Sequence, residues 1–108
     1  MFVLIIGSAP DALEAQNFNR ELFQGIVAIN NAWNVRDDWD FCIFPDDFPE
    51  NRRPNENKEQ KLISSEQYVP LQNKYGGFVY SGGTMAFTAG YWVLGYFKPK
   101  TIGYIGCD

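Results

Sequence analysis

The sequence predicts an α/β domain, namely a three-layer Rossmann-like fold with a mainly parallel sheet. Short apolar segments rich in β-branched and aromatic residues alternate with longer polar or helix-like stretches, which is typical of alternating strands and helices. The segment Phe2–Ile6 is apolar throughout, as expected for a strand that is covered on both faces. The 108 residues are 45% hydrophobic and 17% aromatic, enough for one core but not for two. We therefore expect residues 1–108 to form a single nucleotide-binding-type domain.

The strands are assigned from these apolar segments. We expect strands at residues 2–6, 26–29, 41–44 and 101–105, and a weaker strand at either 67–69 or 78–80.

Two helices are expected between the strands. Asp11 could cap the first, over residues 11–17, with Pro10 marking the turn before it. The second covers residues 84–97, which are apolar nearly all round and are followed by Pro99, so we expect a buried helix packed on the sheet. Gly90 would weaken this helix but permit a close approach to a strand.

Residues 49–67 are polar, charged and interrupted by two prolines, and they predict a loop excursion with a helical turn around 58–62. The excursion carries four basic side chains: Arg52, Arg53, Lys58 and Lys61. They form either a solvated surface loop or a lid that reaches over an anionic ligand, and the sequence does not separate these alternatives.

Composition excludes several classes of protein. The net charge of −4 without a basic cluster disfavours nucleic acid as a partner. No segment has the pattern of a signal peptide or a membrane span, so we expect a cytoplasmic protein. Cys42 and Cys107 lack CxxC spacing, which favours two reduced thiols over a disulfide or a zinc site. The absence of histidine excludes a histidine-based triad, so a carboxylate or the substrate would have to move protons.

Small and polar residues follow the predicted strands. In open α/β sheets, ligands bind outside the carboxyl ends of the strands, so these residues are the candidates for a site. They are Gly7, Ser8 and Ala9; Asn30 and Asn31; Pro45, Asp46 and Asp47; Ser81, Gly82, Gly83 and Thr84 ahead of the second helix; and Gly106, Cys107 and Asp108.

Each group suits one part of a nucleotide. The glycine–serine pair after the first strand would expose backbone N–H groups, and the "SGGT" helix start would offer N–H groups and a hydroxyl to a phosphate. The two asparagines can donate to and accept from a base or a sugar. The two aspartates could bind a hydroxyl, act as acid or base, or share a Mg²⁺ ion. Taken singly, each group also fits an ordinary turn or a solvated loop.

Two familiar motifs are absent or misplaced. The "GSAP" stretch matches neither GxGxxG nor GxxxxGK[ST]. Asp38-Trp39-Asp40 spells the DxD of metal-dependent glycosyltransferases, but it precedes a predicted strand and so belongs at the opposite edge of the sheet.

Four segments together resemble a known superfamily: "VLIIGSAPD", "VAINNAW", "DWDFCIFPDDF" and "SGGTMAFTAGYWVLGYFKPKTIGYIGCD". They resemble the Rossmann-like core shared by bacterial and phage sialyltransferase-like proteins, motility-associated glycosyltransferase-like proteins and the 6-hydroxymethylpterin diphosphokinase-like family. The resemblance covers nearly the whole chain except residues 49–67.

The resemblance implies a role for several residues. Residues 7–10 would face the phosphates, Asn30 would meet the nucleotide or donor sugar, residues 81–84 would close the pocket, and Asp108 would lie at the floor of the active site. The chain departs from the family's G-x-G-P-S loop at Ala9 and Asp11. Family enzymes continue past G-x-D, so the resemblance implies a truncated chain, a minimal binding core or a degenerate relative.

The expected function is binding of a nucleotide or nucleotide-sugar by a glycosyltransferase-like protein, with Asp46 and Asp108 as the catalytic candidates. One alternative is an ATP-dependent pyrophosphokinase, which would require Mg²⁺ with Asp46 and Asp47 as ligands. The other is a non-catalytic phage or bacterial domain that oligomerises through exposed aromatic residues. Its four candidates are Trp33, Tyr91, Trp92 and Phe97.

Overall fold

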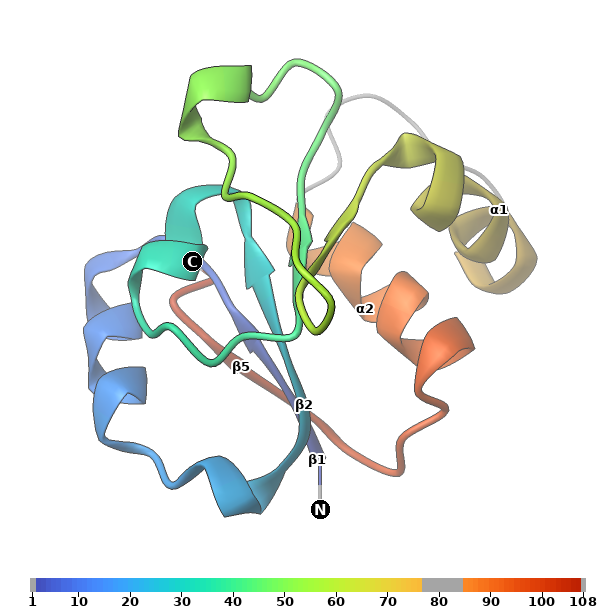
Figure 1. Ribbon diagram of the computed structural model, residues 1–108. Helices are drawn as coiled ribbons and strands as arrows, with labels where there is room; N and C mark the ends of the chain where they lie inside the picture. The colour runs from blue at the N-terminus through green and yellow to red at the C-terminus, as the bar shows by residue number, and fades with distance from the viewer. Residues whose placement is uncertain (1, 77–84, 108) are drawn as a thin grey trace.

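A computed structural model describes residues 2–76 and 85–107 and shows a five-stranded parallel sheet in the order β4-β3-β2-β1-β5 (Figure 1). The predicted α/β fold with a parallel sheet is confirmed. The strands are β1 (Phe2–Ile6), β2 (Phe23–Ile29), β3 (Phe41–Ile43), β4 (Lys61–Ile63) and β5 (Ile102–Ile105).

Helical segments cover both faces of the sheet, which gives the three predicted layers (Figure 1). One face carries short 3-10 segments and the other carries two α-helices. The segments are η1 (Pro10–Asn17), η2 (Arg20–Leu22), η3 (Asn30–Asn34), η4 (Glu50–Arg52), α1 (Ser65–Gly76) and α2 (Met85–Tyr96).

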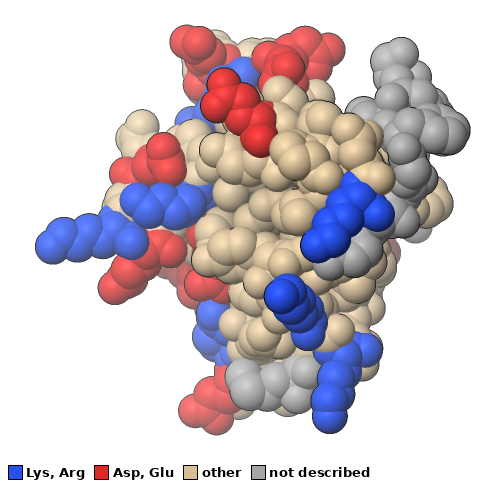
Figure 2. Space-filling view, turned by 90° about the vertical axis from the view of Figure 1, so that its right-hand side faces the viewer, with Lys and Arg blue, Asp and Glu red and all other residues tan. Residues whose placement is uncertain are grey.

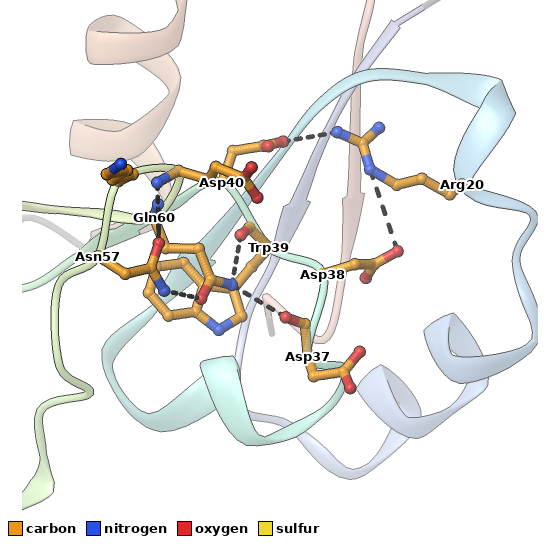
Figure 3. A pocket seen from close by; sticks show the side chains of 9 residues that line it. Arg20, Asp37, Asp38, Trp39, Asp40, Asn57 and Gln60 are labelled. Carbon is orange, nitrogen blue, oxygen red and sulfur yellow. Dashed lines mark hydrogen bonds and ion pairs between the residues drawn. The ribbon is translucent and has the colours of Figure 1, made fainter.

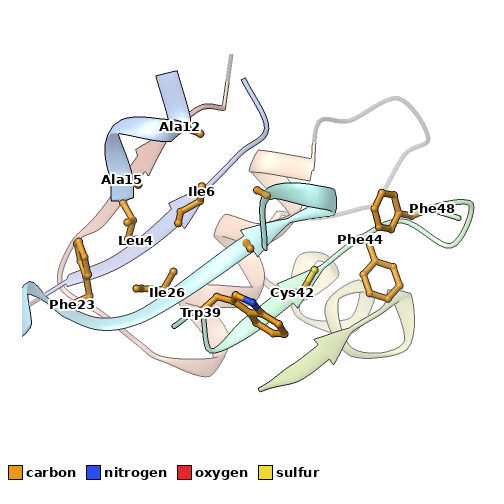
Figure 4. Packing of buried hydrophobic residues seen from close by; sticks show 12 residues of the cluster. Leu4, Ile6, Ala12, Ala15, Phe23, Ile26, Trp39, Cys42, Phe44 and Phe48 are labelled. Carbon is orange, nitrogen blue, oxygen red and sulfur yellow. The ribbon is translucent and has the colours of Figure 1, made fainter. Parts of the chain in front are cut away.

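The unbroken apolar run of β1 fills two cores because successive side chains point to opposite faces. Leu4 and Ile6 pack with η1 and η3, whereas Val3 and Ile5 pack beneath α1 and α2. Figure 4 shows the first core, in which Leu4 and Ile6 lie near the small alanines of η1, and Trp39 belongs to the same cluster. The position of β1 inside the sheet, between β2 and β5, with helical segments on both faces, thus explains its composition.

Most expected elements are confirmed with small shifts at their ends. The first strand has its predicted bounds, β2 begins three residues earlier than expected, and the apolar helix begins at Met85 and ends at Tyr96. Gly90 allows the predicted close approach to a strand, since a Cβ there would lie 2.5 Å from the Tyr104 hydroxyl of β5. No helix among residues 2–76 and 85–107 is long and apolar enough to cross a membrane.

The prediction for residues 49–67 was wrong in part. Residues 61–63 form β4 rather than a helical turn, because Lys61 N–H donates to Asp40 O and the Gln60 amide donates to the carbonyls of Asp37 and Trp39. These bonds align the segment beside β3. The expected strand at 67–69 is instead the first half of α1, and 78–80 lie outside the described residues.

Two helix expectations also need correction. The 10–17 segment is a 3-10 helix whose N-cap is Ala9, so Asp11 lies in its first turn and caps nothing. Helix α2 is only partly buried, because Phe87, Leu94 and Tyr96 are exposed.

Candidate functional site at the carboxyl ends of the strands

A cavity of about 180 Å³ lies where β1, β2 and β5 end and α2 begins. The expected site residues Gly7, Ser8, Asn30 and Cys107 all line it, together with Met85 at the start of α2. Strands far apart in sequence therefore bring their following residues to one edge, as the parallel topology predicts.

A second cavity of about 240 Å³ lies on the other side of the loop after β1. Ser8, Ala9 and Asn31 line it, with Leu13 of η1 and Val35. Ordinary ligand pockets measure roughly 300–1,000 Å³, so each cavity alone is too small for a nucleotide. Because Ser8 borders both, a ligand that crosses this loop could occupy the two together.

Gly7, which follows β1, bonds to the protein's own backbone rather than facing a ligand with a free N–H. Gly7 N–H donates to Ile105 O (2.8 Å) and Ala9 N–H donates to Gly106 O (3.0 Å). A Cβ on Gly7 would lie 2.1 Å from Gly106 O, so no larger residue fits there without moving the backbone. Of the expected free N–H groups of Gly7 and Ser8, that of Gly7 is taken by Ile105 O of β5, so this half of the expectation was wrong. Ser8 N–H has no partner among the described residues.

Asn30 is the unusual residue of the site. Its backbone has a φ of 54°, in the left-handed region that residues with a Cβ rarely adopt. Its Oδ1 is buried and has no hydrogen-bond partner within the described residues, whereas its backbone oxygen accepts from the Cys42 thiol. A strained backbone and an unpaired buried acceptor thus coincide at one residue.

Asp46 and Asp47 do not line either cavity. Both carboxylate oxygens of Asp46 accept from the Ser65 hydroxyl at the start of α1 (2.7 and 2.9 Å). Burial, together with the nearby carboxylates of Asp46 and Asp47, raises the pKa of the Tyr68 hydroxyl. The structure therefore places this pair over the β3–β4 side of the sheet, with Ser65 as a contact that the sequence analysis missed. No group of three or more potential metal-ligating side chains occurs in residues 2–76 and 85–107.

The predicted residues Ser81, Gly82, Gly83, Thr84 and Asp108 lie outside the described residues. Their roles remain predictions.

A larger hollow, of about 750 Å³, lies at the opposite edge of the sheet (Figure 3). Asp40 accepts from Arg20 Nη2 (2.9 Å) and from Ile26 N–H (2.8 Å), and Arg20 also donates to Phe23 O. Arg36 donates to both oxygens of Asp38. The aspartates of the DxD-like sequence thus lie at the amino end of β3, as expected, and are paired with arginines.

The basic residues of the excursion give no support to a lid. Arg53 donates to Phe48 O and lies over the Phe44 ring at 4.4 Å, so it fixes the course of its own loop. Arg52, Lys58 and Lys61 are exposed, and none of them borders the cavities at the carboxyl edge.

The four aromatic residues proposed for oligomerisation do not form one exposed patch. Trp92 is buried, and the other three are half-buried. Trp92 and Phe97 pack instead in a ring cluster with Phe41 and Tyr96.

The comparisons with known proteins leave the family open: no family model, no curated protein and no solved structure matches this chain.

Proposed function

We propose that the chain binds a nucleotide or nucleotide-sugar at the carboxyl edge of its sheet, as the binding domain of a glycosyltransferase-like protein. The observation that carries the proposal is Asn30, whose side-chain oxygen is buried beside the cavity and has no partner in the part of the chain that the structure describes. Leaving such a group unpaired costs about 1–3 kcal/mol, and a left-handed non-glycine residue adds to that cost. A hydroxyl or amino group of a ligand would donate to this oxygen and offset the first cost.

A phosphate has a suitable position at Ser8. This residue borders both cavities and offers a hydroxyl and a backbone N–H, and the first turn of α2 directs further N–H groups toward the first cavity. No lysine or arginine lines either cavity. The binding energy would therefore come from fixed dipoles, and we expect modest affinity without a need for a metal ion.

This arrangement would place the phosphate over the loop after β1. For a nucleotide-sugar, the nucleoside would then lie on one side of Ser8 and the donor sugar on the other. Asn30 would contact the part of the ligand in the first cavity and Asn31 the part in the second. The pyrophosphokinase alternative needs Asp46 as a magnesium ligand, and no contact of Asp46 favours that role over its bond to Ser65.

The test is a thermal-shift screen of CMP, UDP, ATP and GTP at millimolar concentration, with and without Mg²⁺. A ligand present at tenfold its Kd should raise the Tm by about 5 °C. We expect a pyrimidine nucleotide to do so without Mg²⁺, and the shift to disappear in Asn30→Gly.

Asn55→Gly is the matched control, because Asn55 is exposed in the excursion and lines neither cavity. Stabilisation by ATP alone, and only with Mg²⁺, would favour the pyrophosphokinase alternative. The absence of a shift with all four nucleotides would contradict the proposal.

A further inference from the structure

The two outer strands of the sheet, β4 and β5, differ in whether other groups of the chain bond to their outer edges. At β4, Lys61 N–H and Ile63 O bond toward β3, so Leu62 directs its N–H outward, where the Glu56 carboxylate accepts from it at 3.3 Å. The next outward N–H, that of Ser64, donates to the Gln67 side chain at 2.8 Å. Side chains of the excursion and of α1 thus occupy the outer edge of β4 and prevent another strand from pairing there.

The outer edge of β5 has no such protection from the residues that the structure describes. Thr101 O and Ile105 O accept from Val3 and Gly7 of β1 and its following loop. Because alternate residues of a strand direct their backbone groups to opposite sides, Ile102 and Tyr104 direct theirs away from β1. Neither residue has an outward backbone partner within residues 2–76 and 85–107.

Apolar side chains flank this open edge. A hollow of about 220 Å³ runs between α2 and β5, and it is lined only by apolar residues, tyrosines and a glycine. Phe87 is 66% exposed, Tyr104 49% and Leu94 38%. Figure 2 shows the face formed by α1 and α2, which is mostly uncharged, with a few Lys or Arg side chains toward its right and lower parts. An open strand edge beside exposed apolar surface is suited to pairing with another strand.

We propose that a second copy of this chain pairs with β5 in the antiparallel direction, which joins two five-stranded sheets into one continuous sheet. A strand pair needs both outward-facing residues opposite one another. This requirement is met when Ile102 of one copy faces Tyr104 of the other and Gly103 lies on the two-fold axis. Each Ile102–Tyr104 pair then exchanges two hydrogen bonds, and Gly103, which has no side chain, lets the two strands approach at the axis.

Charge favours a second copy in this direction. The hollow has no charged lining residue, so two like surfaces meet without repulsion in a chain whose net charge is −4. In this register Lys100 lies level with the partner copy's Gly106, which contacts Ala12 next to the exposed Asp11 of η1. The antiparallel direction therefore brings the basic end of one β5 to the acidic end of the other, whereas a parallel pair would bring the lysines together.

Sedimentation velocity of the 108-residue chain tests the proposal over micromolar to submillimolar concentrations. We expect the mean mass to rise with concentration toward twice that of the monomer. Tyr104→Lys should shift the dissociation midpoint at least tenfold upward in concentration, because it puts a charge into the apolar pair.

Tyr96→Lys is the matched control. Tyr96 is the same residue type with similar exposure (58%), but it stacks on Trp92 away from β5 and should leave the mass curve unchanged. If Tyr104→Lys fails to fold, as judged by circular dichroism, Phe87→Lys on the surface of α2 serves in its place. A native chain that stays monomeric throughout, or a dimer that responds equally to both tyrosine variants, would overturn the proposal.

Discussion

The two ends of the sheet carry opposite kinds of hollow. The hollow at the amino ends of the strands is about four times larger, yet Arg20, Asp38 and Asp40 at its wall are held in ion pairs. The cavity at the carboxyl ends is small but is lined by Asn30, with a strained backbone and an oxygen that has no partner within residues 2–76 and 85–107. The comparison teaches that unmet hydrogen-bonding capacity is a better guide to a binding site here than volume is.

The same comparison separates residues that stabilise the fold from residues that cost stability. Removing a residue from the amino-end network should destabilise the protein, whereas removing the side chain of Asn30 should stabilise it.

Gly7→Ala should have the largest effect, a loss of about 4 kcal/mol in the free energy of unfolding. Its Cβ would meet backbone atoms of Gly106, which cannot move without breaking the bonds between the loop after β1 and the end of β5. Urea denaturation measures the loss. Gly95→Ala is the control, since the atoms nearest to its Cβ belong to the Leu71 side chain rather than to backbone, and a side chain can shift at lower cost. Equal losses would show that the approach of Gly7 to Gly106 is not rigid.

Arg36→Met should lower the free energy of unfolding by about 3 kcal/mol. The Arg36 side chain is only 11% exposed, and it donates to the carbonyls of Ala15 and Phe18 as well as to Asp38. The substitution would remove the donor to Phe18 O and Asp38, whereas Ala15 O would keep the N–H of Phe18. Arg52→Met, at an exposed side chain, should change stability little. A small effect at Arg36 would mean that water satisfies the same acceptors.

Asp38→Asn should lower stability by about 1 kcal/mol at neutral pH, and the difference from the native protein should vanish in acid. The hydrogen bonds from Arg36 hold the pKa of Asp38 below its ordinary value of 3.8. A carboxyl with a depressed pKa stabilises the fold above that ordinary value, and the contribution is lost as the pH falls through the folded-state pKa. Urea midpoints across this range measure the difference. Asp37→Asn, which alters a carboxylate without an ion pair in the described chain, should show no such convergence.

Asn30→Gly should have the smallest effect and the opposite sign, a gain of up to about 1 kcal/mol without ligand. Glycine adopts a φ of 54° freely, and the substitution removes the unpaired oxygen. Thermal unfolding without nucleotide measures the gain. A loss of stability instead would indicate that Asn30 serves the fold, and the functional assignment of this residue would lose its support.

The strands β1 and β2 were predicted well from the sequence, because each contains an unbroken apolar run and the residues that follow each run in the sequence are typical of turns. The prediction failed at β4, where only three residues pair and the strand depends on Gln60 and Asp40 rather than on its own pattern. It also missed α1, whose polar composition and internal Pro70 weaken the periodic signal. A local signal for α1 was nevertheless present: Ser64 and Gln67 form the side-chain contact of an S-x-x-Q capping box.

The candidate site was predictable in outline, since parallel strands bring their carboxyl ends to one edge. Which groups remain available was not predictable. The sequence cannot show that the N–H groups of Gly7 and Ala9 donate to residues 105 and 106, or that the Ser65 hydroxyl donates to Asp46. Each of these hydrogen bonds joins segments that are distant along the chain. Asn30 was selected for its amide, but its strained backbone becomes visible only in three dimensions.

The register of β1 against β5, which sets Val3 beside Ile102, constrains how this protein is made. β1, an interior strand, is synthesised before the other four, and β5, one of its two neighbours, is synthesised after them. The nascent polypeptide must therefore leave the ribosome almost to residue 105 before β1 is paired on both sides, and until then chaperones would meet an open apolar edge on β1.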